Sequence, residues 1–260
     1  MEQIPSATRF QEMLPLPQRG RTWTAEQAVR LGDVTPRGRL RLDAAARYLQ
    51  DVANDDAMEA NLDGAMAWVV RRTTLHVHTF PTFRERLELT TFCSGTGSHW
   101  AERRTSMRTV EGGHLEAAAV WVHVNQTTGR PVKIGPGFEE TYGEAAQGRR
   151  VRARLHHSDP TEAQISSSAL FPLRFSDFDL LGHVNNAILL AIVEDQLAKR
   201  RELRAPLWAE VEYRATLQRD SVVAVAVAEE ANSFRLWVLD RNAGAVVCSA
   251  AVGLLSAATL

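Results

Sequence analysis

The sequence predicts an α+β fold in which one helix and a run of antiparallel strands occur twice along the chain. In both halves a helical apolar pattern is followed by several runs of strand type, rather than by the single strands of an alternating βαβ fold. The halves also align with each other, because residues 30–51 match residues 174–195 at a constant offset of 144 positions. We therefore expect two similar units, each with one long helix and an antiparallel sheet.

The first unit follows an irregular arm over residues 1–20, which holds three prolines. A strand is expected over residues 23–34, and the stretch Thr-Pro-Arg-Gly at 35–38 then turns the chain. Apolar side chains recur at helical spacing at positions 42, 45, 46, 49, 52 and 53 and predict an amphipathic helix. Four strands are expected next, over residues 68–80, 86–95, 100–110 and 115–124.

The second unit begins with alternating Leu173, Phe175 and Phe178, a pattern that favours the end of a strand. After a turn, residues 187–193 read AILLAIV and are apolar on every side, so other parts of the protein must surround this helix. The helix is expected from residue 185 to about residue 201. Four further strands are expected over residues 209–214, 221–229, 234–239 and 245–254.

The segment between the units differs in composition from both. It contains Gly-Pro-Gly at 135–137 and the basic stretch GRRVRARLHH at 148–157, which is typical of a solvated connection. The expected division is an N-terminal domain over residues 20–134, a linker over 135–168 and a C-terminal domain over 169–258.

Composition excludes several classes of protein. The chain has 260 residues, of which 45% are hydrophobic and 23% charged, and its net charge of −1 attracts it neither to nucleic acid nor to a membrane surface. The N-terminus lacks an apolar signal core, and no stretch reaches the roughly 20 apolar residues of a membrane span, so a cytoplasmic protein is expected. Cys93 and Cys248 are too few for a disulfide framework or a zinc site and are expected to be buried.

The turn before the second helix is the expected place for chemistry. Asp179 and His183 lie in this turn, and Asn185 or Asn186 would cap the helix that follows. The unpaired N–H groups of the first helical turn and the positive end of the helix dipole would then point at whatever lies beside Asp179 and His183. Such an arrangement is suited to stabilise an oxyanion.

The two units differ at the titratable positions of this turn. Thr35 takes the place of Asp179, and Arg39 takes the place of His183. The scaffold positions agree while the titratable positions do not. This difference predicts that the second unit is chemically active and that the first is retained for its shape.

Two other acids near the turn are interpreted as structural. Asp177 has a counterpart in Asp33, which favours bonding to turn amides or to Arg174. Glu194 matches Gln50 and is expected to satisfy local polar groups rather than to face the site.

Four longer segments of the sequence resemble motifs of a known family. They are AWVVRRTTLHVHTFPTFRERLELTTFCSGTGSHWAERRTSMR, AAAVWVHVNQTTGRPVKI, SDFDLLGHVNNA and EYRATLQRDSV. Over roughly residues 20–255 the chain resembles the acyl-ACP thioesterases of plants and bacteria, whose pattern includes W-V-x-R-R, S-x-G and W-x-x-x-(N/D)-x-x-T-x-R-(P/R). The resemblance implies a tandem hot-dog fold, in which each antiparallel sheet wraps one long central helix, and release of a fatty acid from acyl-ACP.

The resemblance also carries over to single residues. Asp179 and His183 match the Asp and His of the family motif D-x-N-x-H-V-N-N, but the Asn between them is Leu181 here. The Glu and Cys of the later plant motif E-Y-R-R-E-C-G-R-D-S-V fall on Thr216 and Leu217. Part of the plant constellation is therefore missing, which leaves a site centred on one carboxylate.

The expected mechanism uses Asp179 as general base or nucleophile and His183 as its assistant. Helix amides near Asn185 and Asn186 would polarise the thioester carbonyl. No metal or organic cofactor is implied. The expected partner is an acyl carrier protein, or a CoA thioester, as substrate carrier, and either a pseudo-dimeric monomer or a homodimer is compatible with two tandem units.

Several alternatives stay open. Asp179 and His183 also fit a turn-capping pair without a catalytic part. The chain is compatible with a hot-dog acyl-CoA thioesterase and, because family polar residues are replaced, with a non-catalytic acyl-binding protein. Hot-dog enoyl hydratases are disfavoured, since their Asp and His are five positions apart and these two are four apart.

A basic cluster follows the second helix, formed by Lys199, Arg200, Arg201 and Arg204. It would suit the acidic surface of a carrier protein, but cations also stabilise a helix C-terminus without any partner.

Overall fold

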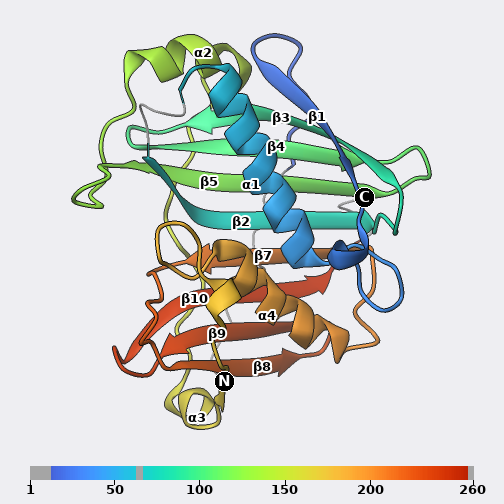
Figure 1. Ribbon diagram of the computed structural model, residues 1–260, viewed down its shortest axis with the longest axis vertical. Helices are drawn as coiled ribbons and strands as arrows, with labels where there is room; N and C mark the ends of the chain where they lie inside the picture. The colour runs from blue at the N-terminus through green and yellow to red at the C-terminus, as the bar shows by residue number, and fades with distance from the viewer. Residues whose placement is uncertain (1–12, 63–66, 257–260) are drawn as a thin grey trace, which may run out of the picture.

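Ten strands form one antiparallel sheet that includes both halves of the chain (Figure 1). The computed structural model describes residues 13–62 and 67–256. The first half contributes β1 (Thr22–Ala28), β2 (Ala67–Thr79), β3 (Arg86–Thr96), β4 (Trp100–Arg108) and β5 (His114–Val124). The second half contributes β6 (Ala169–Leu170), β7 (Leu207–Tyr213), β8 (Val223–Glu230), β9 (Ser233–Asp240) and β10 (Ala245–Leu254).

The two halves meet in the middle of this sheet. The strand order is β1-β3-β4-β5-β2-β7-β10-β9-β8-β6, so β2 of the first half pairs with β7 of the second. The pairing is antiparallel and runs from Arg72 opposite Glu212 to Val77 opposite Leu207. The backbone hydrogen bonds of the two units are therefore continuous.

Most of the expected strands are confirmed. The eight expected from residue 68 onward all occur, and their ends lie within two residues of the predicted ends. Alternating apolar residues were a sufficient signal because one face of each strand packs on the core.

The strand expected to end at Phe178 is wrong. The chain there forms a 3-10 turn, Phe175–Asp177, and β6 is only two residues long. The Asp177 side chain is buried and accepts a hydrogen bond from the Arg174 N–H at 2.8 Å, so the chain curls locally instead of extending. An equivalent 3-10 turn, Leu31–Asp33, follows β1, which ends well before residue 34.

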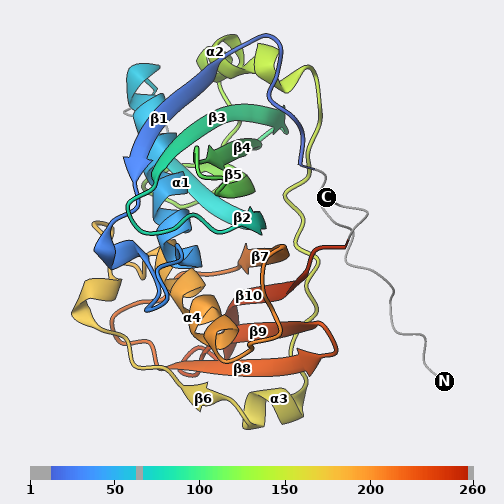
Figure 2. The same ribbon diagram turned by 90° about the vertical axis from the view of Figure 1, so that its right-hand side faces the viewer.

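Two long helices pack side by side on one face of the sheet (Figures 1 and 2). They are α1 (Leu42–Glu59) and α4 (Asn186–Ala198), both close to the expected ranges. α4 is buried on most of its circumference, as its apolar sequence predicts. Within the described residues, no helix combines the length and the apolar character that are needed to cross a bilayer.

The segment expected to be a linker has structure of its own. It contains α2 (Pro136–Ala146), which packs on β3, and α3 (Glu162–Ser166), which lies against β8. Between these helices the chain crosses the face of the sheet opposite to α1 and α4 (Figure 2).

We call residues 149–158 the outer segment. The indole N–H of Trp100 donates to the Val151 carbonyl at 2.9 Å, and that of Trp237 donates to the Ser158 carbonyl at 2.8 Å. Strand tryptophans thus hold both ends of the outer segment against the sheet.

The main core lies between the sheet and the two long helices and is continuous across both halves. Cys93 and Cys248 are buried free thiols, as predicted.

Candidate active site

The turn expected to carry the chemistry occurs in both halves with the same backbone bonds. The Asp179 N–H donates to the His183 carbonyl at 2.9 Å, and the Thr35 N–H donates to the Arg39 carbonyl at 2.8 Å. The glycine of each turn has a positive φ, 75° and 83°, which a residue with a Cβ adopts only with strain. The alignment at an offset of 144 positions therefore describes equivalent positions in space.

Asp179 is partly exposed and caps this turn. Its Oδ1 accepts the N–H groups of Leu181 at 2.9 Å and His183 at 3.4 Å. Thr35 does the same in the first half, where its hydroxyl accepts the Arg37 N–H at 3.3 Å. Within the part of the chain that the structure describes, the second oxygen, Oδ2, has no hydrogen-bond partner, and the two side chains of Asp179 and His183 do not bond each other. Capping thus uses one carboxylate oxygen and leaves the other available.

The start of α4 is built as the sequence predicts. Asn185 is the N-cap, and its Oδ1 accepts the Ala187 N–H at 2.9 Å. The Asn185 N–H donates to the Asp177 carbonyl at 2.9 Å, which ties the helix start to the turn. Asn186 is the first helical residue, and among the described residues its N–H has no hydrogen-bond acceptor. This N–H is a donor at the positive end of the helix dipole.

The equivalent place in the first half is closed by an ion pair. The Arg39 guanidinium lies 2.6 and 3.2 Å from the two carboxylate oxygens of Glu194 on α4. Glu194 also accepts the N–H of Leu42, the first residue of α1, at 3.1 Å. Glu194 thus satisfies local polar groups, as expected. At the start of α4 the positions equivalent to Arg39 and Glu194 are held by His183 and by Gln50 of α1.

A cavity of about 260 Å³ lies in the first half, between α1, α2 and the sheet. Its walls are mostly apolar, but they also include polar residues of α1 and the charged residues Glu102 and Arg103 of β4. They include Gln50, Ala53, Asn54 and Ala57 of α1, Trp68, Cys93 and Trp121 of the sheet, and Phe138 and Tyr142 of α2. Burial raises the pKa of the Cys93 thiol to about 11, so this thiol stays protonated at neutral pH and forms part of the wall.

A groove of about 400 Å³ lies at the end of α4. Its wall includes Leu197, Ala198 and Arg201, which match Ala53, Asn54 and Ala57 of the cavity. The turn at Thr35–Arg39 borders the groove on its other side.

The positions at which family residues are replaced lie next to the turn. The Leu217 carbonyl accepts the Val184 N–H at 3.2 Å, while the Leu217 side chain is buried. Thr216 is exposed, and Leu181 is 77% exposed. Segment 216–217 thus contacts the start of α4 without bringing a titratable side chain to it.

Gln50 is the residue that sequence reasoning missed. Its position was aligned with that of Glu194, but nothing in the sequence indicated that Gln50 lines a cavity. The alignment of the two units carried a signal for it. A polar residue on one long helix that faces the start of the other helix should have a counterpart that faces the start of the first.

The basic cluster after α4 is only partly a surface. Arg200 is buried, pairs with Glu229 at 2.9 Å and packs over the ring of Phe234 at 4.2 Å. The Arg204 guanidinium donates to the Arg201 carbonyl at 2.9 Å. Arg200 also donates to the Gln196 carbonyl in the last turn of α4, so it stabilises the helix C-terminus, as one of the two interpretations of this cluster predicts.

Comparison with known proteins identifies the family. Residues 20–142 match the acyl-ACP thioesterase N-terminal domain, and residues 160–253 match the acyl-ACP thioesterase C-terminal domain. An uncharacterised protein of Mycobacterium tuberculosis is 27% identical over 203 residues, which cover 78% of this chain and 80% of that protein. A chloroplast acyl-[acyl-carrier-protein] hydrolase of Cuphea viscosissima is 29% identical over 61% of this chain and 40% of its own length.

Solved structures agree on the fold. The 12:0-ACP thioesterase of Umbellularia californica superposes with a TM-score of 0.72 at 21% identity, over 90% of this chain and 97% of that one. An acyl-ACP thioesterase of Bacteroides thetaiotaomicron superposes with a TM-score of 0.72 at 19% identity, over 89% and 97%. The expected tandem hot-dog arrangement is therefore confirmed, and the chain belongs to the acyl-ACP thioesterase family.

Proposed function

We propose that this chain hydrolyses fatty acyl-ACP to a free fatty acid and the carrier thiol, with the reaction at the start of α4 and the acyl chain in the first-half cavity. The active unit is then the C-terminal domain, and the N-terminal domain shapes the acyl site.

The observation that carries the proposal is the equivalence of the two halves. The turn at Thr35–Arg39 of the first half and the end of α4 of the second half border the same groove. By the equivalence of the two halves, we expect the Asp179 turn to face the end of α1, where Ala53, Asn54 and Ala57 line the cavity. The same equivalence predicts that the Asn186 N–H faces Gln50, because the Leu42 N–H donates to Glu194. This arrangement would combine a free carboxylate oxygen, a free helix N–H and a mostly apolar cavity at one place.

These groups supply the chemistry of thioester hydrolysis. Asp179 Oδ2 either removes a proton from water, which attacks the carbonyl carbon, or attacks that carbon directly. The Asn186 N–H stabilises the negative charge on the carbonyl oxygen, and His183 supplies a proton to the leaving thiolate as the C–S bond breaks. When Asp179 attacks directly, water then hydrolyses the acyl anhydride and restores the carboxylate.

A carrier protein is favoured by the surface around the turn as well as by the family. Phe175, Leu180 and Leu181 are large apolar side chains exposed at 83%, 101% and 77%. The Arg219 guanidinium lies over the rings of Phe175 and Phe178 at 5.5 and 5.7 Å. An apolar patch with a cation beside it suits an acidic carrier that delivers a thioester.

The decisive experiment removes the charge of Asp179 and keeps its cap. In Asp179→Asn the amide oxygen still accepts the turn N–H groups, so the fold should persist while hydrolysis of acyl-ACP falls at least tenfold, or about 1.4 kcal/mol in barrier. The matched control is Thr35→Val, which removes the equivalent cap in the other half and should leave the rate unchanged.

The same assay separates the alternatives. Free thiol release is measured for acyl-ACP and acyl-CoA of several chain lengths. An unchanged rate in Asp179→Asn would refute the assignment of the base. Acyl binding without turnover in the wild type would favour the acyl-binding protein, in which Asp179 only caps its turn as Thr35 does.

A further inference from the structure

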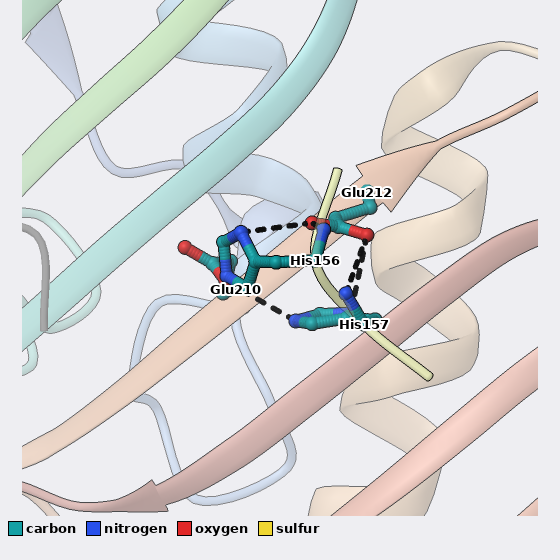
Figure 3. Close-up of side chains that lie close together, drawn as sticks. All are labelled: His156, His157, Glu210 and Glu212. Atoms are coloured by element: carbon teal, nitrogen blue, oxygen red, sulfur yellow. Dashed lines mark hydrogen bonds and ion pairs between the residues drawn. The ribbon is translucent and has the colours of Figure 1, made fainter. Parts of the chain in front are cut away.

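Two histidines and two glutamates converge on the outer face of the sheet (Figure 3). Glu210 and Glu212 of β7 point to the same face because alternate strand residues share a face, and both are buried. His156 and His157 come from the outer segment, which crosses this face. Ligand atoms of the four side chains lie within 4.8 Å of one another.

Both imidazole rings approach one carboxylate oxygen. His156 Nε2 lies 2.7 Å and His157 Nε2 lies 3.1 Å from Oε1 of Glu210. Ligands at 2.0–2.2 Å from a tetrahedral metal ion are about 3.3–3.6 Å apart, so each Nε2 atom would move away from Oε1 by about 0.5 Å or less to make room for an ion. Thr74 and Arg72 approach the other oxygen, Oε2, at 2.9 and 3.9 Å, which leaves Oε1 for the ion.

The far side of each ring faces an oxygen that can accept a hydrogen bond. His156 Nδ1 lies 3.3 Å from Glu212 Oε1, and His157 Nδ1 lies 3.1 Å from Ser249 Oγ. A neutral imidazole has only one N–H. Neutral rings that donate from Nδ1 leave two Nε2 lone pairs facing a carboxylate oxygen, and a cation between them removes that repulsion. Metal-binding histidines commonly hydrogen-bond from the second nitrogen in this way.

We propose that His156 Nε2, His157 Nε2 and Glu210 Oε1 bind a divalent transition-metal ion, with Glu212 and Ser249 orienting the rings. Two imidazoles and one carboxylate suit Zn²⁺ and leave a fourth position for water. The His156 side chain is 45% exposed, so an ion has access from solvent. The ion fixes the outer segment, and with it the connection between the two units, to the strand at the centre of the sheet.

The test uses the full-length chain, stripped with a chelator and titrated with Zn²⁺ in a calorimeter. We expect one ion per chain with a Kd below about 10 µM, and a rise in Tm when Zn²⁺ is present. His156→Ala removes an exposed ligand and should weaken binding at least a hundredfold. The matched control is His114→Ala, which removes a ring stacked on His78 at 4.3 Å elsewhere on the sheet and should bind Zn²⁺ as the wild type does.

Substitution of an orienting group gives a second test. Glu212→Gln should weaken Zn²⁺ binding by about 10–100-fold, the usual effect of losing a carboxylate that holds a metal-binding histidine. A wild-type chain that takes up no Zn²⁺, or a His156→Ala chain that binds it as tightly as the wild type, would overturn the proposal. Hydrolysis is not among the readouts, so the outcome is independent of the proposed function.

Discussion

The two halves have the same turn and helix start, yet they treat the polar groups there in opposite ways. At the start of α1, Arg39 and Glu194 of α4 neutralise each other and occupy the helix start. At the start of α4, the equivalent positions hold His183 and Gln50 of α1, and Gln50 lines a cavity. The difference teaches that one backbone arrangement can hold a buried ion pair at one helix start and an imidazole and an amide at the other.

α1 and α4 also differ in the side chains that they present to the cavity and to the groove. α1 presents Ala53 and Ala57 to the cavity, while the matching positions of the second half hold the larger Leu197 and the charged Arg201. Small side chains leave a volume that an acyl chain can fill, and every buried methylene contributes about 0.8 kcal/mol. Under the proposed function, the first half is specialised for binding and the second for chemistry, although they share one fold.

The largest expected effect comes from breaking the ion pair that closes the first site. Glu194→Ala removes the charged partner of the Arg39 guanidinium and the acceptor of the Leu42 N–H in a mostly buried place, and should destabilise the protein by about 3–5 kcal/mol. Urea unfolding followed by circular dichroism measures this loss. Gln50→Ala, at the equivalent position, should cost less than about 1 kcal/mol.

A double variant sharpens this result. Arg39→Met with Glu194→Leu replaces both charges with apolar side chains of similar size and should recover most of the lost stability. If the double variant is as unstable as Glu194→Ala, the ion pair is not what holds the first site closed.

A buried histidine on β2, the central strand of the first half, predicts a loss of stability in acid. Burial lowers the pKa of His76 on β2 to about 4, with further lowering by His78 and Arg104, from an ordinary value near 6.5. The group is neutral in both states above pH 6.5. As the pH falls to about 4, only the unfolded chain gains the proton, so stability decreases by up to about 3 kcal/mol.

Paired unfolding experiments at pH 7 and pH 4.5 check this prediction. His76→Gln cannot gain the proton and should lose less stability than the wild type over this interval. Equal losses in the two proteins would show that His76 is not responsible for the acid sensitivity of β2.

Filling the cavity should change chain-length preference without changing the chemistry. Ala57→Leu adds three carbon atoms to the cavity wall and should weaken the use of the longest acyl chains by about 2 kcal/mol, or roughly thirtyfold in kcat/KM. Short chains should react as before. The matched control is Ala198→Leu in the groove of the other half, which should leave the chain-length profile unchanged.

Periodicity predicted the strands and both long helices because each packs one face, or nearly its whole surface, against the core. It did not predict the 3-10 turn at Phe175–Asp177, since the bond from the Arg174 N–H to Asp177 is local and leaves the apolar alternation intact. Periodicity also did not predict the pairing of β2 with β7, because strand pairing between two units leaves no hydrophobic pattern in the sequence of either unit.

The candidate site was predicted in part for a similar reason. Asp179, Asn185 and Asn186 could be placed from capping rules, which depend on neighbours in sequence. Gln50 depends on packing between helices far apart in the chain. His156 and His157 lie in a basic stretch that is typical of a solvated connection, and only the fold brings Glu210 and Glu212 under them.

The smallest expected effect concerns the caps of the two helices. α4 has a side-chain cap, Asn185, while α1 begins after Arg41, which makes no such bond. Asn185→Ala should therefore destabilise the protein by about 1 kcal/mol, and Asn185→Ser, whose hydroxyl also accepts the N–H, by a few tenths. Because the Ala187 N–H is freed and the Asn186 N–H loses its fixed direction, hydrolysis should fall more in the alanine variant than in the serine variant. Thermal unfolding and kcat/KM measured on the same samples separate a cap that only stabilises the helix from one that also aims a donor at the thioester.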